Sequence, residues 1–554
     1  MNPHPRILII GAGIVGCSLA YHLAQLGWRD IVVLEQGPLA VNWGSSSHAP
    51  GLMFQHNNSR AVTQLAQWSV ETYLRVQSQS PAERLVWQTG SFEIAHTPQR
   101  WEELKRKLGN CRAWGLPAEL VDAAEVKRQV PIMRTDDLYG ALYVPSDADV
   151  NAAGLCAAMC ALAAADGAVE FHEYMPVTGI EVADGRVRAV LTPHGRLATE
   201  LVVCAAGLWG PLIGKMAGVP IPLMPCQHLY VRTQPLPELR GETEIVRHPV
   251  VRYQDQDMYF RQHGEAYGFG SYRHEPLMVP ADDLPHDDHP AIFPFTPQHM
   301  QTSWRDAIHR VPALANAQVA HQFNGLFSFT ADGNSILGET PAVRGFWAAE
   351  AVWVTHAGGV GRALAEWIDS GLPPLDLREL DINRFQPHAF SRPYLRQRAE
   401  RQYIEVYDIV HPLQPAGVAR DLRLSPLHAR LQALGGFFTE SAGWERPQWF
   451  AANESRLPAG PPAHPVRSGW AARFWSYIIG AEHAAAREAV GLFDLSAFAK
   501  LEISGPGALA YLQRLAANQM DTPLGRITYT ALLTERGGLK ADLTITRLGP
   551  DQFW

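Results

Sequence analysis

Hydrophobic residues near the start of the chain form two short continuous runs with a helical pattern between them. The run RILII at residues 6–10 is typical of a fully buried strand, and DIVVLE at residues 30–35 is a second such run. Between them, the apolar residues of VGCSLAYHLAQLG, residues 15–27, recur at helical spacing. A strand, a helix and a second strand within about thirty residues predict the βαβ unit of a dinucleotide-binding domain.

The turn between the first strand and the helix reads GAGIVG, with glycines at positions 11, 13 and 16. The first glycine permits a tight turn, the second lets a pyrophosphate approach the helix N-terminus, and the third lets the helix pack closely on the strand. Glu35 closes the second strand, where a carboxylate hydrogen-bonds ribose hydroxyls and repels a 2′-phosphate. Gly11, Gly13, Gly16 and Glu35 are therefore predicted to bind FAD or NAD rather than NADP. The alternatives are a surface turn for the glycines and a solvated strand end for Glu35.

Two further segments carry signals of a contact with the same cofactor. ELVVCAAGLWG, residues 200–210, is an apolar strand that ends in small residues, so Ala206 and Gly207 are predicted to lie against the cofactor. In NWGSSSHAPGL, residues 42–52, one histidine stands among small residues that let the backbone approach a ligand. From this pattern alone, His48 is either a cap of the loop or a contact with the cofactor.

Residues 221–275 alternate in strand fashion and are rich in aromatic side chains, which predicts an antiparallel sheet over the cofactor. His228 and Tyr259 stand within this strand sequence as candidate functional residues, although each alone is more often a core residue. Further on, AVWVTHAGGVGRALAEWIDSG places a glycine-rich turn before a helix. Gly358 and Gly359 are therefore predicted to receive part of the cofactor at a helix N-terminus.

The overall composition and charge of the chain argue against a nucleic-acid or membrane partner. The chain has 554 residues, of which 47% are hydrophobic and 18% charged, and its formal net charge is -8. This balance gives no electrostatic support for nucleic acid, and no apolar run reaches the length of a membrane span. Six cysteines without a C-x-x-C pair indicate neither a disulfide framework nor a metal site, and MNPHPRILIIGAG leaves no room for a signal peptide. A cytoplasmic protein that binds small molecules is expected.

The chain resembles the flavoprotein amine oxidases of the dimethylglycine oxidase, dimethylglycine dehydrogenase and sarcosine dehydrogenase group. The resemblance covers nearly the whole chain and rests on GAGIVG, GSSSHAPGL, VVCAAGLWG, MYFRQHGEAYGFGSYRHEP, GLFSFTADG, AEAVWVTHAGG and YDIVHPLQP. It implies a fold of the α/β and α+β classes. Residues 1–371 are then a Rossmann-type FAD-binding domain with an antiparallel-sheet substrate domain, residues 372–427 a small connecting domain, and residues 428–554 part of an aminomethyltransferase-like domain.

The resemblance implies that His48 carries FAD covalently through its imidazole, and that His228 and Tyr259 hold and deprotonate the substrate amine. The amine must lose its proton, because an ammonium group has no lone pair to stabilise the iminium that forms as hydride leaves. Arg261 lies two residues past Tyr259, so spacing predicts that it binds the substrate carboxylate, with a surface arginine as the alternative. The expected reaction is FAD-dependent oxidative demethylation of dimethylglycine or sarcosine. The expected electron acceptor is oxygen or an electron-transfer flavoprotein.

Residues 428–554 resemble the start of the folate-binding domain of the glycine-cleavage T protein. Asp542 matches the acid that acts near the folate amine in that family, with a turn carboxylate as the alternative. The match stops at Trp554, a short way into that domain, so transfer of a one-carbon unit to tetrahydrofolate is expected to be impaired or absent. Two rival hypotheses are a folate-binding module with a vestigial flavin domain and an NAD-linked dehydrogenase. The second cofactor strand and His48 disfavour the dehydrogenase.

Overall fold

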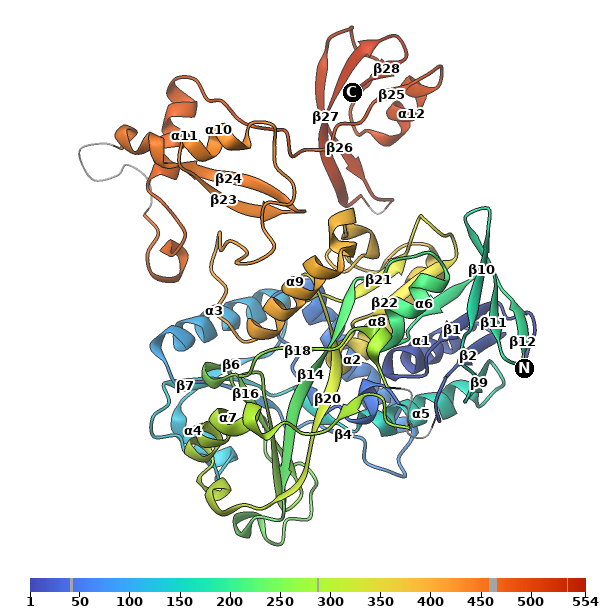
Figure 1. Ribbon diagram of the computed structural model, residues 1–554, viewed down its shortest axis with the longest axis vertical. Helices are drawn as coiled ribbons and strands as arrows, with labels where there is room; N and C mark the ends of the chain where they lie inside the picture. Colours follow the sequence, from blue (N-terminus) through green and yellow to red (C-terminus); the bar gives the residue numbers. More distant parts are fainter. Residues whose placement is uncertain (40–42, 286–287, 458–465, 536) are drawn as a thin grey trace. The chain divides into compact units, whose positions relative to one another are not determined.

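The computed structural model describes residues 1–39, 43–285, 288–457, 466–535 and 537–554. Their contacts divide the chain into two compact units, the first made of residues 1–411 and 416–419 and the second of residues 412–415 and 420–554. Figure 1 shows the elements of each unit along the chain. Asn42, the first residue of the predicted His48 loop, lies outside the described residues.

A six-stranded sheet forms the centre of the first unit. Its order is β21-β22-β13-β1-β2-β9, and all neighbours are parallel except β21 and β22. The strands are β1 (Ile7–Ile10), β2 (Ile31–Leu34), β9 (Val169–His172), β13 (Val202–Cys204), β21 (Ile336–Glu339) and β22 (Phe346–Glu350). Every residue of β1 and β2 is buried, which explains their uninterrupted apolar sequence.

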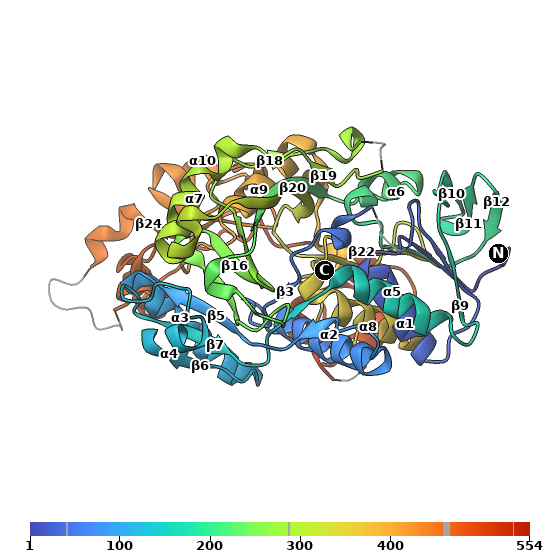
Figure 2. The same ribbon diagram turned by 90° about the horizontal axis from the view of Figure 1, so that it is seen from below.

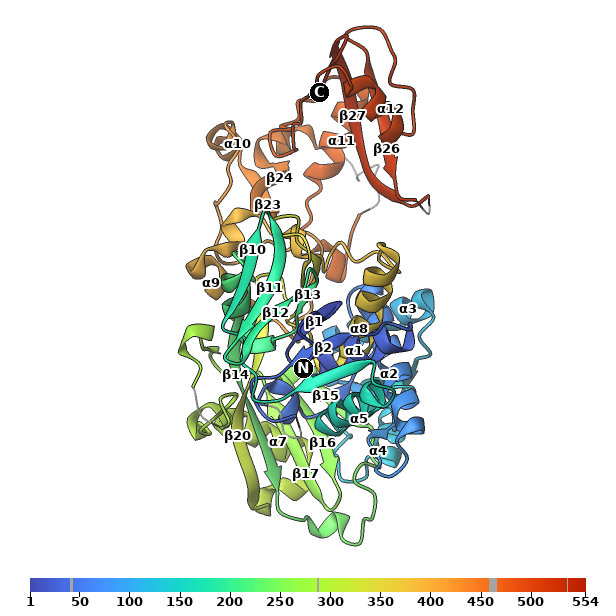
Figure 3. The same ribbon diagram turned by 90° about the vertical axis from the view of Figure 1, so that its right-hand side faces the viewer.

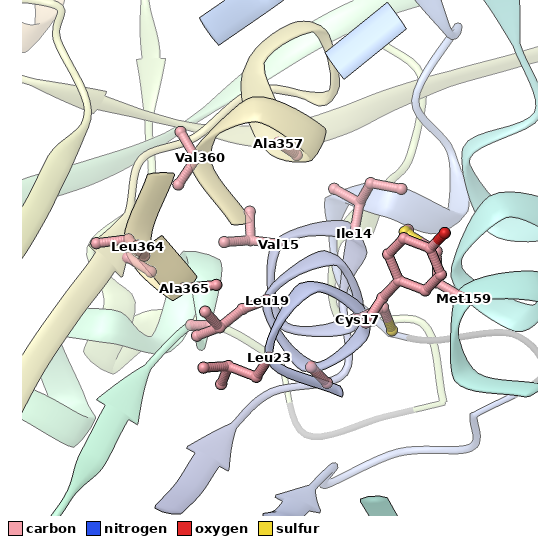
Figure 4. Packing of buried hydrophobic residues seen from close by; sticks show 14 of the residues in the cluster. Ile14, Val15, Cys17, Leu19, Leu23, Met159, Ala357, Val360, Leu364 and Ala365 are labelled. Atoms are coloured by element: carbon pink, nitrogen blue, oxygen red, sulfur yellow. The ribbon is translucent and has the colours of Figure 1, made fainter. Parts of the chain in front are cut away.

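Helices cover one face of this sheet. They are α1 (Ile14–Gln25), α2 (Arg60–Gln79), α5 (Ala152–Ala164) and α8 (Val354–Ser370), and they lie together in Figure 2. Figure 4 shows Val15 and Leu19 of α1 beside Val360 and Leu364 of α8, all of them buried in one hydrophobic cluster. The burial of these apolar faces against one another is the main source of stability in this layer.

The opposite face of the sheet packs against a small antiparallel sheet and a short helix. The small sheet contains β10 (Gly179–Ala183), β11 (Arg186–Thr192) and β12 (Gly195–Ala198), and the helix is α6 (Gly210–Met216). The six-stranded sheet is therefore buried on both faces, as parallel sheets generally are.

A larger sheet follows, with the order β19-β20-β14-β17-β16-β15-β5-β7-β6, and β18 pairs with β14 at its side. Among its described strands, only β15 and β5 pair in parallel. Its strands are β5 (Ser91–Ala95), β6 (Glu119–Val121), β7 (Gly140–Val144), β14 (Leu223–Thr233), β15 (Val250–Tyr253), β16 (Met258–His263), β17 (Ala266–Ser271), β18 (Leu277–Met278), β19 (Ile292–Phe293) and β20 (Val319–Thr330). The predicted antiparallel sheet within residues 221–275 is thus present.

Four helices lie beside the large sheet, namely α3 (Pro98–Trp114), α4 (Ala123–Gln129), α7 (Pro297–Arg310) and α9 (Arg392–Ile404). A three-stranded sheet also belongs to this unit, with β3 (Leu52–Met53) and β4 (Val86–Trp87) both paired to β8 (Ala148–Val150). The strand β3 therefore anchors the end of the loop that contains His48.

The described residues of the second unit form two small sheets. One pairs β23 (Gly436–Ser441) with β24 (Trp444–Phe450), and the other has the order β25-β28-β27-β26. Its remaining elements are α10 (His428–Ala433), α11 (Ile478–Glu488), α12 (Ala508–Leu515), β25 (Ile503–Ser504), β26 (Ile527–Leu533), β27 (Leu539–Gly549) and β28 (Gln552–Phe553). Figure 3 shows β26 and β27 as a long hairpin beside α12. The predicted fold class is confirmed, whereas the division at residues 371 and 427 stays a prediction.

Candidate active site

A cavity of about 280 Å³ lies between the six-stranded sheet and the large sheet, lined by residues of both. From the first sheet come the glycine turn after β1, Glu35 after β2, residues 205–209 after β13, and residues 351–355 at the start of α8. From the large sheet come side chains of β14, β15, β16 and β20. The loop of residues 44–52 lies along the same cavity, so most of the residues predicted to bind a cofactor meet here.

The glycine turn leaves no room for side chains. Gly11 has φ +104°, and a Cβ atom placed there would lie 2.4 Å from the carbonyl oxygen of Ala205. A Cβ atom on Gly16 would lie 1.9 Å from the carbonyl oxygen of Gly11, so this glycine lets α1 pack on β1 as predicted. Gly13 is the N-cap of α1 and has no capping side chain, and the backbone N–H of Ile14 donates to Oγ of Ser46 at 3.1 Å. The helix N-terminus therefore faces the cavity with backbone donors, an arrangement that favours a bound phosphate.

Glu35 is buried beside this turn, with 7% of its surface exposed. Its Oε2 accepts a hydrogen bond from the backbone N–H of Ala12 at 2.8 Å, and its Oε1 accepts one from Gly37 at 2.9 Å. Burial raises the pKa of Glu35, and the backbone donors act against that rise. Each oxygen keeps further lone-pair capacity toward the cavity, which fits the predicted contact with ribose hydroxyls.

His48 enters the cavity opposite a glycine of the large sheet. A Cβ atom on Gly325 would lie 2.5 Å from Cδ2 of His48, so this glycine makes room for the ring. The Nε2 atom of His48 lies 3.2 Å from the carbonyl oxygen of Leu326, and Nδ1 is buried without a hydrogen-bond partner in the described part of the chain. Burial lowers the pKa of His48 to about 4, so at neutral pH the imidazole is uncharged.

Ala206 and Gly207 also line the cavity, on a segment held by a carboxyl group that sequence reasoning missed. The backbone N–H of Ala206 donates to Oε1 of Glu350 at 2.7 Å, and Glu350 is fully buried at the end of β22. Burial raises the pKa of Glu350 to about 8. Its only sequence signal is a carboxylate at the end of an apolar strand, a pattern that also describes many solvated strand ends.

Gly358 and Gly359 do not line the cavity, which corrects their predicted role. Both lie inside α8, where a Cβ atom on Gly359 would lie 2.0 Å from the carbonyl oxygen of Leu65, and one on Gly358 would lie 2.8 Å from Cα of Ser69. These glycines allow α8 to approach α2 closely. The cavity instead meets residues 351–355, at and just before the start of the helix.

His228 and Tyr259 lie together on the cavity wall, where Nε2 of His228 is 2.8 Å from the phenolic oxygen of Tyr259. A Cβ atom on Gly270 would lie 2.2 Å from that phenolic oxygen, so a glycine in the next strand provides the space for Tyr259. Burial holds the pKa of His228 well below its usual value and that of Tyr259 well above it. Both groups are therefore neutral near pH 7.

Arg261 lies outside the cavity lining, and a different arginine occupies the predicted position. The Nη2 atom of Arg261 is 2.6 Å from Oδ1 of buried Asp149, and Nη1 donates to the carbonyl oxygen of Pro50. Arg252 instead lines the cavity, because it is paired with Tyr259 across the neighbouring strands β15 and β16 and opposite residues share a face. Spacing along β16 could not reveal a partner on β15.

Arg252 shares its carboxylate partner with Lys107 and also hydrogen-bonds with the side chain of Tyr407. Its Nη1 atom lies 3.7 Å from Oε1 of Glu93, but Oε2 of Glu93 already accepts a hydrogen bond from Nζ of Lys107 at 2.6 Å. The guanidinium carbon lies 3.5 Å from the ring centre of Phe54, and Nε has no hydrogen-bond partner within the described ranges. Arg252 is the only lysine or arginine among the described residues that line the cavity, so this cavity favours a ligand with an anionic group.

Asp542 belongs to the second unit, on β27. Its side chain is exposed, and its Oδ2 accepts a hydrogen bond from the hydroxyl of Tyr529 on β26 at 2.7 Å. A predicted role near a folate amine stays a prediction.

Comparison with known proteins decides what kind of nucleotide this arrangement suits. Residues 6–367 match the family described as FAD dependent oxidoreductase, which is more than half of the chain. The chain belongs to this family. Residues 370–425 match the FAD dependent oxidoreductase central domain, and residues 427–554 match the GCVT N-terminal domain. The family resolves the choice between FAD and NAD that the glycine turn left open, in favour of FAD.

Relatives within the family support the resemblance seen in the sequence. The chain is 33% identical to human mitochondrial sarcosine dehydrogenase over 98% of its own length and 61% of that protein. It is 32% identical to 4-methylaminobutanoate oxidase (formaldehyde-forming) of Paenarthrobacter nicotinovorans, covering 99% of this chain and 65% of that one. The chain thus spans less than two thirds of the length of these relatives.

A solved structure of the same fold is that of L-proline dehydrogenase from P. horikoshii. It superimposes with a TM-score of 0.62 at 24% identity, over 69% of this chain and 98% of the other. The likeness shows that the part of the chain it covers shares the fold of that protein. Among the helices that the structure describes, none combines the length and apolar character needed to cross a membrane.

Proposed function

We propose that this chain, with FAD bound, oxidises a small N-methylated amino acid such as sarcosine or dimethylglycine. The observation that carries the proposal is a single cavity lined by a dinucleotide-binding turn, a buried pair of His228 and Tyr259, and one cation, Arg252, whose carboxylate partner is shared with Lys107. The first feature suits the cofactor, the second an amine, and the third a carboxylate. The family and its relatives support this assignment.

The residues present fit FAD. The N-terminus of α1 offers backbone donors to the pyrophosphate, Glu35 offers carboxylate oxygens to the ribose, and Ala206 and Gly207 lie against the cofactor. Bound FAD supplies a hydride acceptor for the oxidation of the C–H bond next to nitrogen. His48 is the proposed point of covalent attachment, because its neutral imidazole keeps a lone pair and its Nδ1 is unpartnered within the described chain.

The large sheet holds the substrate in this proposal. Arg252 binds the carboxylate through charge-assisted hydrogen bonds, which are stronger than neutral ones. Tyr259 stands opposite Arg252 in the sheet and orients the amine, with His228 behind it. Loss of the amine proton leaves a nitrogen lone pair that stabilises the iminium formed when hydride leaves. Hydride loss from the methyl carbon gives an N-methylene iminium, whose hydrolysis releases formaldehyde and the demethylated amine.

The test begins with the absorbance spectrum of the purified protein before and after acid precipitation. Yellow colour that stays with the precipitate, and is lost from it in His48→Ala, supports a covalent histidyl flavin. Colour released into the supernatant keeps the oxidase hypothesis and removes the covalent role of His48. Anaerobic bleaching of the flavin by sarcosine, dimethylglycine or 4-methylaminobutanoate then identifies the substrate class. A flavin that none of these amines bleaches contradicts the proposed function.

The fate of the electrons and of the one-carbon unit is also open to measurement. Reoxidation of the bleached flavin by oxygen, compared with reoxidation by an electron-transfer flavoprotein, separates the two proposed acceptors. A folate-binding module with an inactive flavin domain is the second candidate, because residues 427–554 match the GCVT N-terminal domain and contain Asp542. Calorimetry with tetrahydrofolate tests it, and a colourless protein that FAD does not restore would favour it.

A further inference from the structure

Four side chains form a hydrogen-bonded chain that leads away from the cavity. The hydroxyl of Tyr259 lies 2.8 Å from Nε2 of His228, whose Nδ1 lies 3.3 Å from the hydroxyl of Tyr403. That hydroxyl lies 2.5 Å from Nε2 of His274, and Nδ1 of His274 lies 2.7 Å from the carbonyl oxygen of Glu275. Tyr259 lines the cavity and Tyr403 is fully buried, whereas His274 is half-buried beside the exposed Glu275. The chain therefore connects the cavity with the protein surface.

The last acceptor fixes the direction of every hydrogen bond in this chain. A carbonyl oxygen only accepts, so Nδ1 of His274 carries the hydrogen and Nε2 of the neutral ring accepts from Tyr403. The hydroxyl of Tyr403 is then used as a donor, and its oxygen accepts from Nδ1 of His228. Nε2 of His228 consequently accepts from Tyr259. All four donors point toward the surface, and the oxygen of Tyr259 keeps a lone pair for a donor in the cavity.

The members come from separate parts of the sequence. Tyr259 lies on β16, His228 on β14, Tyr403 near the end of α9, and His274 shortly after β17. Burial keeps them uncharged, since it raises the pKa of Tyr259 and Tyr403 and lowers that of His228 and His274, the last to about 4. A neutral chain can move a proton by successive shifts of O–H and N–H hydrogens without a lasting buried charge.

We propose that these side chains form an outward relay that takes the proton of the substrate ammonium from the cavity to the surface, with Tyr403 and His274 as its positioning and proton-transfer members. The inference rests on the proposed function, because it needs an amine in the cavity. The N–H bond of the ammonium breaks and its electron pair stays on nitrogen. Tyr259 takes that proton and passes its own to His228, which passes one to Tyr403, and Tyr403 passes one to His274. His274 releases one proton to water, and nothing is oxidised or reduced.

Other titratable groups face the relay from the elements packed around it. The ring centres of Tyr272 and His228 are 4.4 Å apart, and those of His299 and His274 are 5.6 Å apart. Further groups that influence the relay electrostatically are His48 at His228, Tyr230 and Tyr407 at Tyr259, and Cys226 and Asp257 at Tyr403. The pH dependence of each of these groups is common to the wild type and to variants of Tyr403 and His274, so a comparison between them isolates the relay.

Anaerobic stopped-flow mixing with sarcosine, in weak buffer containing a pH indicator, tests the relay. The experiment follows flavin bleaching and proton release together over a range of pH in the FAD-loaded protein. In Tyr403→Phe and in His274→Gln, both rates are expected to fall at least about tenfold near pH 7 and to recover at high pH, where the amine arrives unprotonated. His274→Gln keeps an acceptor for the Tyr403 hydroxyl and is only half-buried, so it separates proton transfer from packing.

Tyr267→Phe is the matched control, because Tyr267 is a fully buried tyrosine on β17 that does not line the cavity. Its hydroxyl has no hydrogen-bond partner in the part of the chain that the structure describes, so the wild-type rates and pH profile are expected. The relay is overturned if Tyr403→Phe and His274→Gln keep the wild-type profile, or slow equally at all pH values. A wild-type flavin that sarcosine, dimethylglycine and 4-methylaminobutanoate all fail to bleach overturns the proposed function and the relay together.

Discussion

Arg261 and Asp149 lie together in the interior, with Nη2 of the arginine 2.6 Å from Oδ1 of the aspartate, although burial raises the pKa of Asp149 to about 8. Arg261 also donates to the carbonyl oxygen of Pro50, and Asp149 lies opposite Leu52 where β8 pairs with β3. The two residues thus hold both the middle and the end of the segment that follows His48. This arrangement explains why an arginine placed by spacing near the substrate serves instead to fix a loop.

Removal of the arginine from this pair is expected to be destabilising. Burial raises the pKa of Asp149 to about 8 even beside Arg261, so in Arg261→Met the carboxyl group takes up a proton, and the lost interaction with the guanidinium lowers the free energy of unfolding by about 1.5–3 kcal/mol. Urea denaturation measures the change. Arg196→Met is the control, because Arg196 and Glu181 form a pair with 49% and 41% of their side chains exposed. That substitution is expected to change stability by at most about 1 kcal/mol. Equal stability of the two variants would contradict the buried pair.

Glu350 makes stability depend on pH in an unusual direction. Its pKa is raised from 4.5 to about 8 by burial, so between these values the folded protein keeps a proton that the unfolded chain releases. The free energy of unfolding of the wild type, compared with that of Glu350→Gln at the same pH, is therefore expected to fall by roughly 2–4 kcal/mol as pH rises from about 5 to 8. Unfolding curves across this range measure the difference. The same measurement on Glu200→Gln, at a side chain that is 74% exposed, is the control.

Gly270 provides the space for the hydroxyl of Tyr259. A methyl group there would lie 2.2 Å from the phenolic oxygen, so Gly270→Ala is expected to displace Tyr259 and reduce kcat by at least about 100-fold. Steady-state oxidation of the identified amine checks this. Gly109→Ala in α3 is the matched control, because a Cβ atom there meets nothing within 4 Å. It should leave kcat unchanged and add about 0.5–1 kcal/mol of helix stability.

Arg252 is expected to control the binding of the carboxylate. Arg252→Met removes hydrogen bonds to a charged group, which corresponds to about 1.5–3 kcal/mol and raises KM roughly 10- to 150-fold. The same change at Arg232, an exposed residue of β14, serves as the control. For an amine without a carboxylate, KM should differ little between wild type and Arg252→Met. A large rise in KM for such an amine would show that Arg252 does not act by binding the carboxylate.

The meeting of the glycine turn, Glu35 and the residues after β13 at one cavity could be predicted from the sequence because their signals are local. Gly11 and Glu35 act within a single βαβ unit of fixed geometry, so their spacing in the sequence determines their spacing in space. Gly358 and Gly359 show the limit of this reasoning. A glycine-rich helix start resembles a phosphate site, but close packing of α8 on α2 requires the same residues.

The remaining site residues depend on contacts between segments far apart in the chain. Arg252 was missed because its position is defined by pairing with Tyr259 on the adjacent strand. Tyr403 was missed because its hydroxyl reaches His228 from a helix 175 residues further along the chain. Neither relationship leaves a periodic or compositional signal, since strand register and helix docking are decided by the packing of the whole unit.

The pairing of Arg252 with Tyr259 also fixes the distance between these two residues. Residues directly opposite each other in an antiparallel pair have Cα atoms about 4.5–5.5 Å apart, and backbone hydrogen bonds keep that separation nearly constant. If the arginine binds the carboxylate and the tyrosine binds the amine, the backbone spacing of the two strands selects substrates by the number of carbons between these groups. Substitutions that line the cavity would then change which side groups are accepted, while the preferred length of the substrate would persist until the register of β15 and β16 changed.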